Sequence, residues 1–131
     1  MNKSERIQFE KLMELARRTE NVTCICACSS SLLAGWEKVP VSFPESQMRE
    51  IGTLVSDVDD DPSFAEFHPS NTSYWSKDAP IAVRHFPYNR CTVWECTECR
   101  RCFLRYTEGG GYYVEQRIRS LDSSLIVDAP L

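Results

Sequence analysis

Cysteine is the residue type in this sequence whose number and spacing point most directly to chemistry. Seven cysteines occur in 131 residues, and they fall into two groups. The later group is Cys91, Cys96, Cys99 and Cys102. Within it, Cys96 and Cys99 have the Cys-x-x-Cys spacing that allows two thiolates to hold one ion from a single tight turn. This group therefore predicts half of a tetrahedral metal site rather than a catalytic centre.

The other half of such a site has to come from a distant part of the chain. The earlier group consists of Cys24, Cys26 and Cys28. Its Cys-x-Cys spacing is less typical than Cys-x-x-Cys, although two thiols so placed can still chelate an ion. Two of these three would complete four sulfur ligands for a structural Zn²⁺, and Cys91 and Cys102 would then belong to the core. The predicted zinc ligands are Cys26, Cys28, Cys96 and Cys99.

Three other interpretations of the cysteines stay open at the level of sequence. Cys91-x4-Cys96-x2-Cys99 matches the ligand spacing of plant-type iron–sulfur proteins, although the residues between them are larger than such loops favour. All seven can instead be small apolar residues of the core, because free cysteine is among the most buried residue types. A thiol enzyme is the third interpretation, with one cysteine as the nucleophile and His68 or His85 as its base.

Charge and composition restrict the class of protein. The net charge of −4 argues against an extended nucleic-acid interface, which depends on a positive balance. A zinc-ribbon-like module that contacts nucleic acid through its arginines is nevertheless the alternative function. No apolar run is long enough to span a membrane and the N-terminus lacks a signal-peptide core, which predicts a cytoplasmic protein with reduced thiols. The arginines of the last third are Arg84, Arg90, Arg100, Arg101, Arg105, Arg117 and Arg119.

The elements that must position the cysteines follow from hydrophobic spacing and turn residues. Apolar residues recur at helical spacing over residues 4–19, which predicts an N-terminal helix. Residues 102–106 and 112–115 are β-prone and flank Gly109-Gly110-Gly111, which predicts a hairpin directly after the Cys-x-x-Cys turn, as in a zinc ribbon. These patterns indicate an α+β fold with a small antiparallel sheet, in a single domain of residues 1–131.

Two further segments complete the expected fold. Residues 48–58 fit either a helix or a strand, and a glycine with β-branched residues favours the strand. Ile118, Leu121 and Leu125 share one helical face, which predicts a C-terminal helix over residues 116–127.

A separate group of acidic and aromatic residues predicts a partner-binding surface. An aspartate cluster lacks the spacing of a Ca²⁺ loop, so it is interpreted as a charged face that suits a basic partner protein. Residues 59–80 contain prolines and aromatic residues, which indicates an ordered loop with hydrophobic anchors rather than a linker. The predicted partner-binding residues are Asp57, Asp59, Asp60, Asp61, Phe64, Phe67, Tyr74 and Trp75.

The sequence shows no Ser/His/Asp set and no paired carboxylates, so it predicts a protein without an enzymatic activity. The stretches His85–Cys91, Trp94–Cys99, Phe103–Glu108 and Gly110–Tyr113 resemble a group of bacterial proteins with no assigned reaction. In size, charge and lack of a catalytic set, the chain is also similar to immunity proteins of polymorphic and type VI toxins. The second resemblance implies a bacterial cytoplasmic protein that binds and neutralises a secreted toxin domain.

Overall fold

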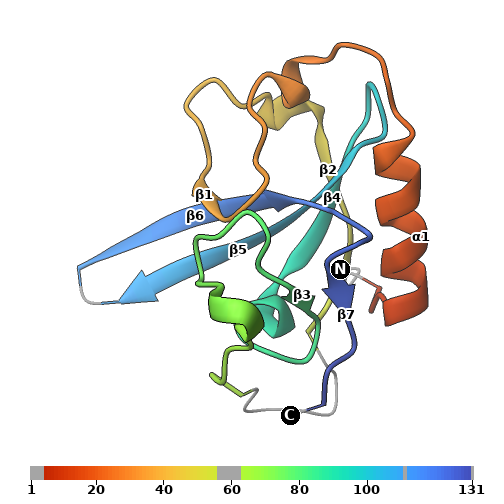
Figure 1. Cartoon of the computed structure of the whole chain (residues 1–131). Coiled ribbons are helices and arrows are strands. Elements are labelled where there is room, and N and C mark those ends of the chain that lie inside the picture. The colour runs from red at the N-terminus through yellow and green to blue at the C-terminus, as the bar shows by residue number, and fades with distance from the viewer. Residues whose placement is uncertain (1–4, 56–62, 111, 131) are drawn as a thin grey trace.

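A five-stranded antiparallel sheet forms the centre of the protein, with strand order β1-β6-β5-β4-β2. The computed structural model describes residues 5–55, 63–110 and 112–130 (Figure 1). One helix, α1, and a two-stranded parallel pair, β3 and β7, accompany the sheet in these residues. The helix and strands are α1 (Phe9–Glu20), β1 (Glu37–Lys38), β2 (Met48–Thr53), β3 (Ile81–Ala82), β4 (Thr92–Cys96), β5 (Cys102–Gly110), β6 (Tyr113–Ser120) and β7 (Ile126–Val127). The 3₁₀ turns are Ala27–Ser29, Glu45–Gln47, Pro69–Asn71 and Tyr88–Arg90.

The N-terminal helix is confirmed, although it begins later than residue 4. Its apolar stripe, which includes Leu12 and Leu15, is buried, and its two last-turn arginines suit the negative end of the helix dipole. The residues before it pair with the edge strand β2. The N–H of Ile7 donates to the carbonyl of Thr53 at 2.8 Å, and the N–H of Thr53 donates to the carbonyl of Glu5 at 2.9 Å. This pairing protects part of an otherwise open sheet edge.

Both faces of the sheet are covered, and each carries its own hydrophobic core. Side chains alternate between the faces of a strand, so Val93 and Leu104 point to one face and Phe103 to the other. The first face packs against α1 and forms the larger core. The second face packs against the loop that follows α1. The smaller core there contains Cys28, Leu33, Phe43, Cys96, Cys99, Phe103 and Ile118.

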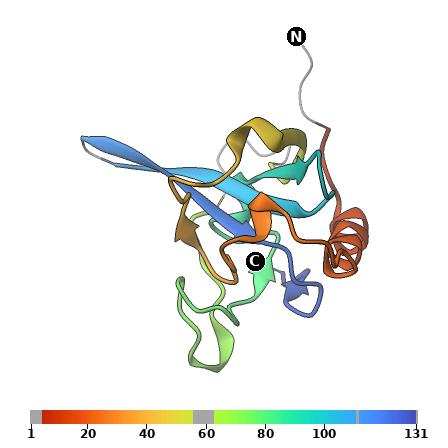
Figure 2. The same cartoon turned by 90° about the horizontal axis from the view of Figure 1, so that it is seen from above.

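The predicted hairpin is confirmed, but its strands are longer than expected. β5 and β6 pair from Phe103 opposite Ser120 to Gly110 opposite Tyr113, so two of the three glycines belong to a strand instead of a turn. Figures 1 and 2 show this hairpin extending beyond the rest of the fold. The strand expected within residues 48–58 is confirmed as β2, and residues 56–58 lie outside the described part of the chain.

The predicted C-terminal helix over residues 116–127 is wrong. The chain there continues β6 to Ser120 and later forms β7. Ile118 is buried in the smaller core, whereas Leu121 is buried in the larger one. Because residues on both faces of the sheet are buried, apolar residues lose their alternation and imitate a helical spacing. The α+β class stands, with a single helix in the described residues, and that helix is too short and too polar to cross a membrane.

Candidate metal centre

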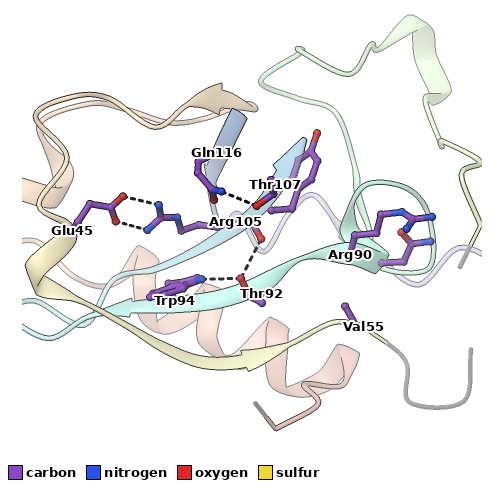
Figure 3. Close-up of a pocket in the computed structure, with 10 residues that line it drawn as sticks. Glu45, Val55, Arg90, Thr92, Trp94, Arg105, Thr107 and Gln116 are labelled. Carbon is purple, nitrogen blue, oxygen red and sulfur yellow. Dashed lines mark hydrogen bonds and ion pairs between the residues drawn. The ribbon is translucent and has the colours of Figure 1, made fainter. Parts of the chain in front are cut away.

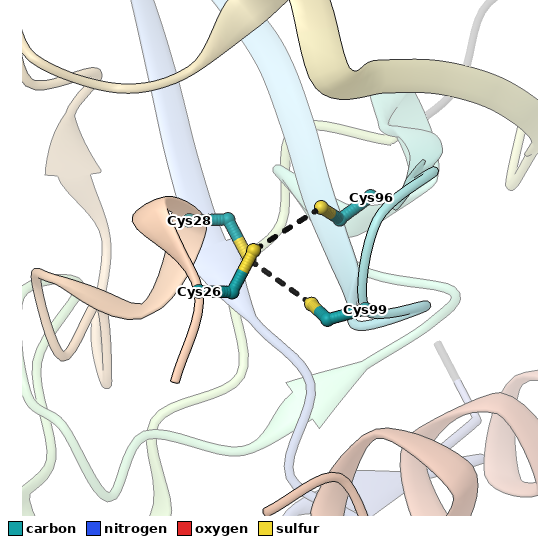
Figure 4. A group of neighbouring side chains, drawn as sticks. All are labelled: Cys26, Cys28, Cys96 and Cys99. Carbon is teal, nitrogen blue, oxygen red and sulfur yellow. Dashed lines mark hydrogen bonds between the residues drawn. The ribbon is translucent and has the colours of Figure 1, made fainter. Parts of the chain in front are cut away.

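Four cysteine side chains from two distant segments meet beside the smaller core. The sulfur atoms of Cys26, Cys28, Cys96 and Cys99 all lie within 4.8 Å of one another (Figure 4). The Sγ–Sγ distance is 3.7 Å between Cys26 and Cys96, and 3.3 Å between Cys28 and Cys99. A disulfide needs about 2.05 Å. Tetrahedral zinc with Zn–S bonds of about 2.3 Å separates its sulfurs by about 3.8 Å, so the cluster fits a metal site.

The turn between β4 and β5 positions Cys96 and Cys99. Two backbone hydrogen bonds close it, from the Arg100 N–H to the Cys96 carbonyl and from the Cys96 N–H to the Arg101 carbonyl, both at 2.8 Å. Arg100 adopts the left-handed conformation, with φ of 74°, which reverses the chain. The backbone N–H groups of Glu98 and Cys99 point at the Cys96 sulfur and favour its thiolate. This turn has the geometry of a metal-binding knuckle.

A 3₁₀ turn after α1 positions Cys26 and Cys28. The N–H of Ser29 donates to the Cys26 carbonyl at 3.0 Å, and the Ser29 hydroxyl donates to the same carbonyl at 2.9 Å. These bonds hold the short Cys-x-Cys segment in a compact turn. Cys28 is buried and Cys26 is half-buried. Despite its unusual Cys-x-Cys spacing, this pair can therefore supply two sulfur ligands to one metal ion.

Arg101 connects the two halves of the centre. Its Nη1 lies 3.4 Å from the Cys99 sulfur. Its Nη2 donates to the carbonyls of Cys24 at 3.0 Å and Val22 at 3.3 Å. Groups that hydrogen-bond to ligands fix their orientation and raise metal affinity. The sequence analysis named Arg101 only among the arginines of the last third and gave it no role at the metal site, although its place two residues after Cys99 was a usable signal.

Gln47 is a second neighbour of the sulfurs that nothing in the sequence indicates. Its Oε1 accepts from the thiols of Cys26 at 3.6 Å and Cys96 at 3.5 Å. A thiolate has no proton to donate. A metal-bound form of the cluster would therefore need the Gln47 amide turned over, with its NH₂ group toward these two sulfurs.

The shifted pKa values of Cys28, Cys96 and Cys99 favour a cation at the centre of the cluster. Burial alone would raise the pKa of Cys99, but hydrogen bonds from the Arg101 backbone, the Cys28 thiol and the Arg101 side chain bring it to about 7. Burial and a hydrogen bond with Cys99 raise the pKa of Cys28 far above its ordinary value. Burial also raises the pKa of Cys96. The Cys99 thiolate therefore forms readily, whereas ionisation of Cys28 and Cys96 needs the charge of a metal ion.

The remaining cysteines lie outside this cluster. Cys91 and Cys102 are buried in the larger core, as expected, and burial raises the pKa of each thiol. Cys24 is exposed. Since Cys91 packs in a different core from Cys96 and Cys99, the ferredoxin-type ligand set is not assembled.

The contacts of the two histidines do not support a thiol enzyme. His68 pairs with Glu66 at 2.6 Å, and His85 packs against the ring of Phe67 with 5.3 Å between centroids. His85 is buried, and burial lowers its pKa. The described contacts of these imidazoles involve a carboxylate and an aromatic ring, whereas a general base needs a nearby thiol.

The predicted partner-binding residues divide into three groups. Phe64 and Trp75 are 67% and 55% exposed, as a binding surface requires. Phe67 packs on His85, and Tyr74 packs against the larger core, so these two aromatic residues serve the fold. The acidic cluster lies outside the described residues, and its members are Asp57, Asp59, Asp60 and Asp61.

An open pocket of about 790 Å³ lies on the same face of the sheet as the metal centre (Figure 3). Six of its lining side chains hydrogen-bond in pairs at 2.5 to 2.8 Å: Glu45 with Arg105, Thr107 with Gln116, and Thr92 with Trp94. Groups that are already paired have little to gain from a polar ligand. The pocket therefore does not present a convergent catalytic set.

Fold and site together define an α+β protein with a four-cysteine cluster able to hold a metal ion. Comparison with protein-family models, with curated proteins and with solved structures finds no match to the chain. The resemblances that the sequence indicates stay predictions.

Proposed function

We propose that this chain is a non-enzymatic protein-binding module whose smaller core is held together by a structural Zn²⁺. The observation that carries the proposal is the closed set of four sulfurs, three of them buried, that joins the loop after α1 to the β4–β5 turn. Structural zinc sites have four protein ligands, whereas catalytic sites keep one position open. The ion would replace hydrophobic contacts that the smaller core lacks.

Metal analysis of the purified protein tests the zinc site. The expected result is one equivalent of zinc, with the four cluster thiols protected from a thiol reagent in addition to the buried Cys91 and Cys102, so that only Cys24 reacts freely under native conditions. Cys26→Ser should lose the metal, and Cys24→Ser, two residues away and exposed, is the matched control that should retain it. Seven freely reacting thiols in the folded protein would contradict the site.

The proposed binding surface centres on Phe64 and Trp75. The guanidinium of Arg90 lies 4.0 Å from the centroid of Phe64, and that of Arg117 lies 4.8 Å from the centroid of Trp75. These cation–π contacts hold two exposed rings in place before a partner arrives. Rigid aromatic anchors are typical of residues that dominate binding energy. A secreted toxin domain, neutralised by an immunity protein, is the partner class that we propose.

Affinity capture from the native host tests the partner proposal. Phe64→Ala and Trp75→Ala should each weaken capture of a specific protein by more than about 1 kcal/mol. Tyr112→Ala removes a fully exposed aromatic ring from the hairpin and should leave capture unchanged. Failure to recover a partner, or equal weakening of capture by all three variants, would contradict the proposal that Phe64 and Trp75 form the binding surface.

The arginines of the last third give little support to the nucleic-acid alternative. Arg119 is fully buried and donates to the carbonyl of Ala79 at 2.7 Å. Arg105 is buried and pairs with Glu45. A phosphate-binding stripe needs exposed guanidinium groups along one surface. We therefore expect no duplex binding in a gel-shift experiment at low salt.

A further inference from the structure

Three arginines from separate elements converge on one carboxylate, on the face of the sheet opposite the Cys96 side chain. Arg49 of β2 places Nη2 2.7 Å from Oε1 of Glu95. Arg100 of the β4–β5 turn places Nε 3.1 Å from Oε2. Arg18, in the last turn of α1, hydrogen-bonds to the same Oε2. Glu95 itself is only 2% exposed, so the carboxylate lies beneath the three guanidinium groups.

The charges in this cluster do not balance. Three guanidinium groups and one carboxylate leave a net charge of +2. The nearby C-terminal end of α1 contributes only about −0.5. The adjacent Cys102 thiol, 3.3 Å from Arg18 Nη2, stays neutral because burial raises its pKa. The proposed zinc centre, with four thiolates and a net charge of −2, lies on the other face of the sheet, where Arg101 contacts it.

The positive groups are both ordered and accessible. The side chains of Arg18, Arg49 and Arg100 are 38%, 61% and 58% exposed. A guanidinium carries five N–H donors, and Glu95 is contacted by one nitrogen of each arginine. Planar guanidinium groups that are held in place lose little entropy when they bind a second anion.

We propose that Arg18, Arg49 and Arg100 form a binding site for a phosphoryl group that carries two negative charges. The charge excess of the cluster matches a phosphate dianion, and arginine pairs with phosphate oxygens through two parallel hydrogen bonds. Free phosphate and a phosphate monoester share this chemistry. The rings of Phe64 and Trp75 face Arg90 and Arg117 rather than these three arginines, so this proposal does not rest on the partner-binding surface.

Titration of the full-length, metal-loaded protein with inorganic phosphate tests the site. The expected result is saturable binding at low ionic strength. Changes in the amide chemical shifts of residues around Glu95 measure this binding. Arg49→Ala should weaken binding at least about ten-fold, since one charge-assisted hydrogen bond contributes about 1.5 kcal/mol or more. Arg84→Ala is the matched control. Arg84 is similarly exposed at 54% but forms a neutral pair with Asp128 at 2.7 Å.

Two further arms identify the source of the phosphoryl group and guard against misfolding. Phenyl phosphate should compete with inorganic phosphate, and a short DNA duplex should not bind. Arg49→Lys keeps the positive charge but loses the planar guanidinium. This variant should fold and should bind phosphate with an affinity between those of wild type and Arg49→Ala. The proposal is overturned by absence of saturable binding in the folded wild-type protein, by equal weakening in Arg49→Ala and Arg84→Ala, or by binding of the duplex alone.

Discussion

Arg101 shows how a single residue outside the ligand set can control the metal centre. Its guanidinium contacts the Cys99 sulfur and two carbonyls of the loop that carries Cys26 and Cys28. Arg101→Met preserves much of the side-chain volume but removes the charge and these donors. We expect zinc affinity to fall about 10- to 100-fold, which is typical for loss of a group that orients a ligand.

Competition with a chromophoric chelator measures the affinity change for Arg101→Met. Zinc stoichiometry should stay at one, because the four sulfur ligands are intact. Arg84→Met is the control, since Arg84 pairs with Asp128 on an unrelated part of the surface. An unchanged zinc affinity in Arg101→Met would show that the contact with Cys99 does not stabilise the bound thiolate.

Glu95 gives a prediction about pH. Burial alone would raise its pKa, but hydrogen bonds from Arg49 and Arg100 and the charge of Arg18 hold the pKa below its ordinary value. A carboxylate with a lowered pKa in the folded state stabilises the protein above its unfolded pKa of about 4.3. That stabilisation is lost as pH falls through the lowered folded pKa. Removing the Glu95 charge at pH 7 should cost about 1.5–3 kcal/mol, because the arginines left behind are partly exposed to solvent.

Urea denaturation of wild type and Glu95→Gln, at equal free zinc, measures this difference. It should be constant from pH 8 to about 5.5 and shrink in stronger acid. Glu14→Gln is the control, because Glu14 is an exposed partner of Lys11 and should change stability by less than about 0.5 kcal/mol. A difference that grows as pH falls would have the wrong sign for this mechanism.

At the scale of the elements, residue spacing predicted the helix and the turn, whose structures depend mainly on neighbouring residues in the sequence. α1 has one buried stripe, and the Cys-x-x-Cys turn leads directly into a strand, so both were predictable. The structure of residues 116–127 could not be predicted in this way, because β6 is covered on both faces and its burial pattern depends on distant segments. The same limit applies to the site. Cys96 and Cys99 were marked by spacing, whereas Gln47 reaches the sulfurs only through the fold.

The contact between β2 and the segment before α1 depends on the absence of a side chain at Gly52. A Cβ there would lie 2.3 Å from Cδ1 of the buried Ile7 and 2.8 Å from the carbonyl oxygen of Glu5. Gly52→Ala should therefore push this segment off the sheet edge and cost about 1–3 kcal/mol. Thermal denaturation measures the loss, and faster hydrogen exchange at the Ile7 amide would locate it.

Gly109→Ala is the matched control within the same sheet. Its Cβ would meet one atom, Cγ1 of Val114 at 3.3 Å, which is the end of an exposed side chain. We expect a stability change within about 0.5 kcal/mol, as for an ordinary surface substitution. Equal losses in Gly52→Ala and Gly109→Ala would mean that the segment before α1 does not pack on β2 as described.

At the scale of the whole molecule, one sheet separates two cores of unequal size. The larger core contains α1, much of the sheet and most of the buried aromatic residues. The smaller core rests mainly on Leu33, Phe43, Phe103 and Ile118, together with the cysteines of the metal centre. The smaller core buries fewer apolar side chains than the larger core and contributes less stability. In the proposed metal-bound form, the loop that carries Cys26 and Cys28 would depend on the metal more than the rest of the fold does.

This dependence predicts how melting temperature varies with free zinc. A single ion that binds only the folded state adds about 1.4 kcal/mol for each ten-fold rise in free zinc above its Kd. For a domain of this size, that corresponds to roughly 5 °C for each ten-fold rise. Calorimetry in zinc buffers of increasing concentration measures the slope. Cys26→Ser should give a flat dependence, and Cys24→Ser should follow wild type. A flat dependence in wild type would show that the four-sulfur cluster holds no zinc.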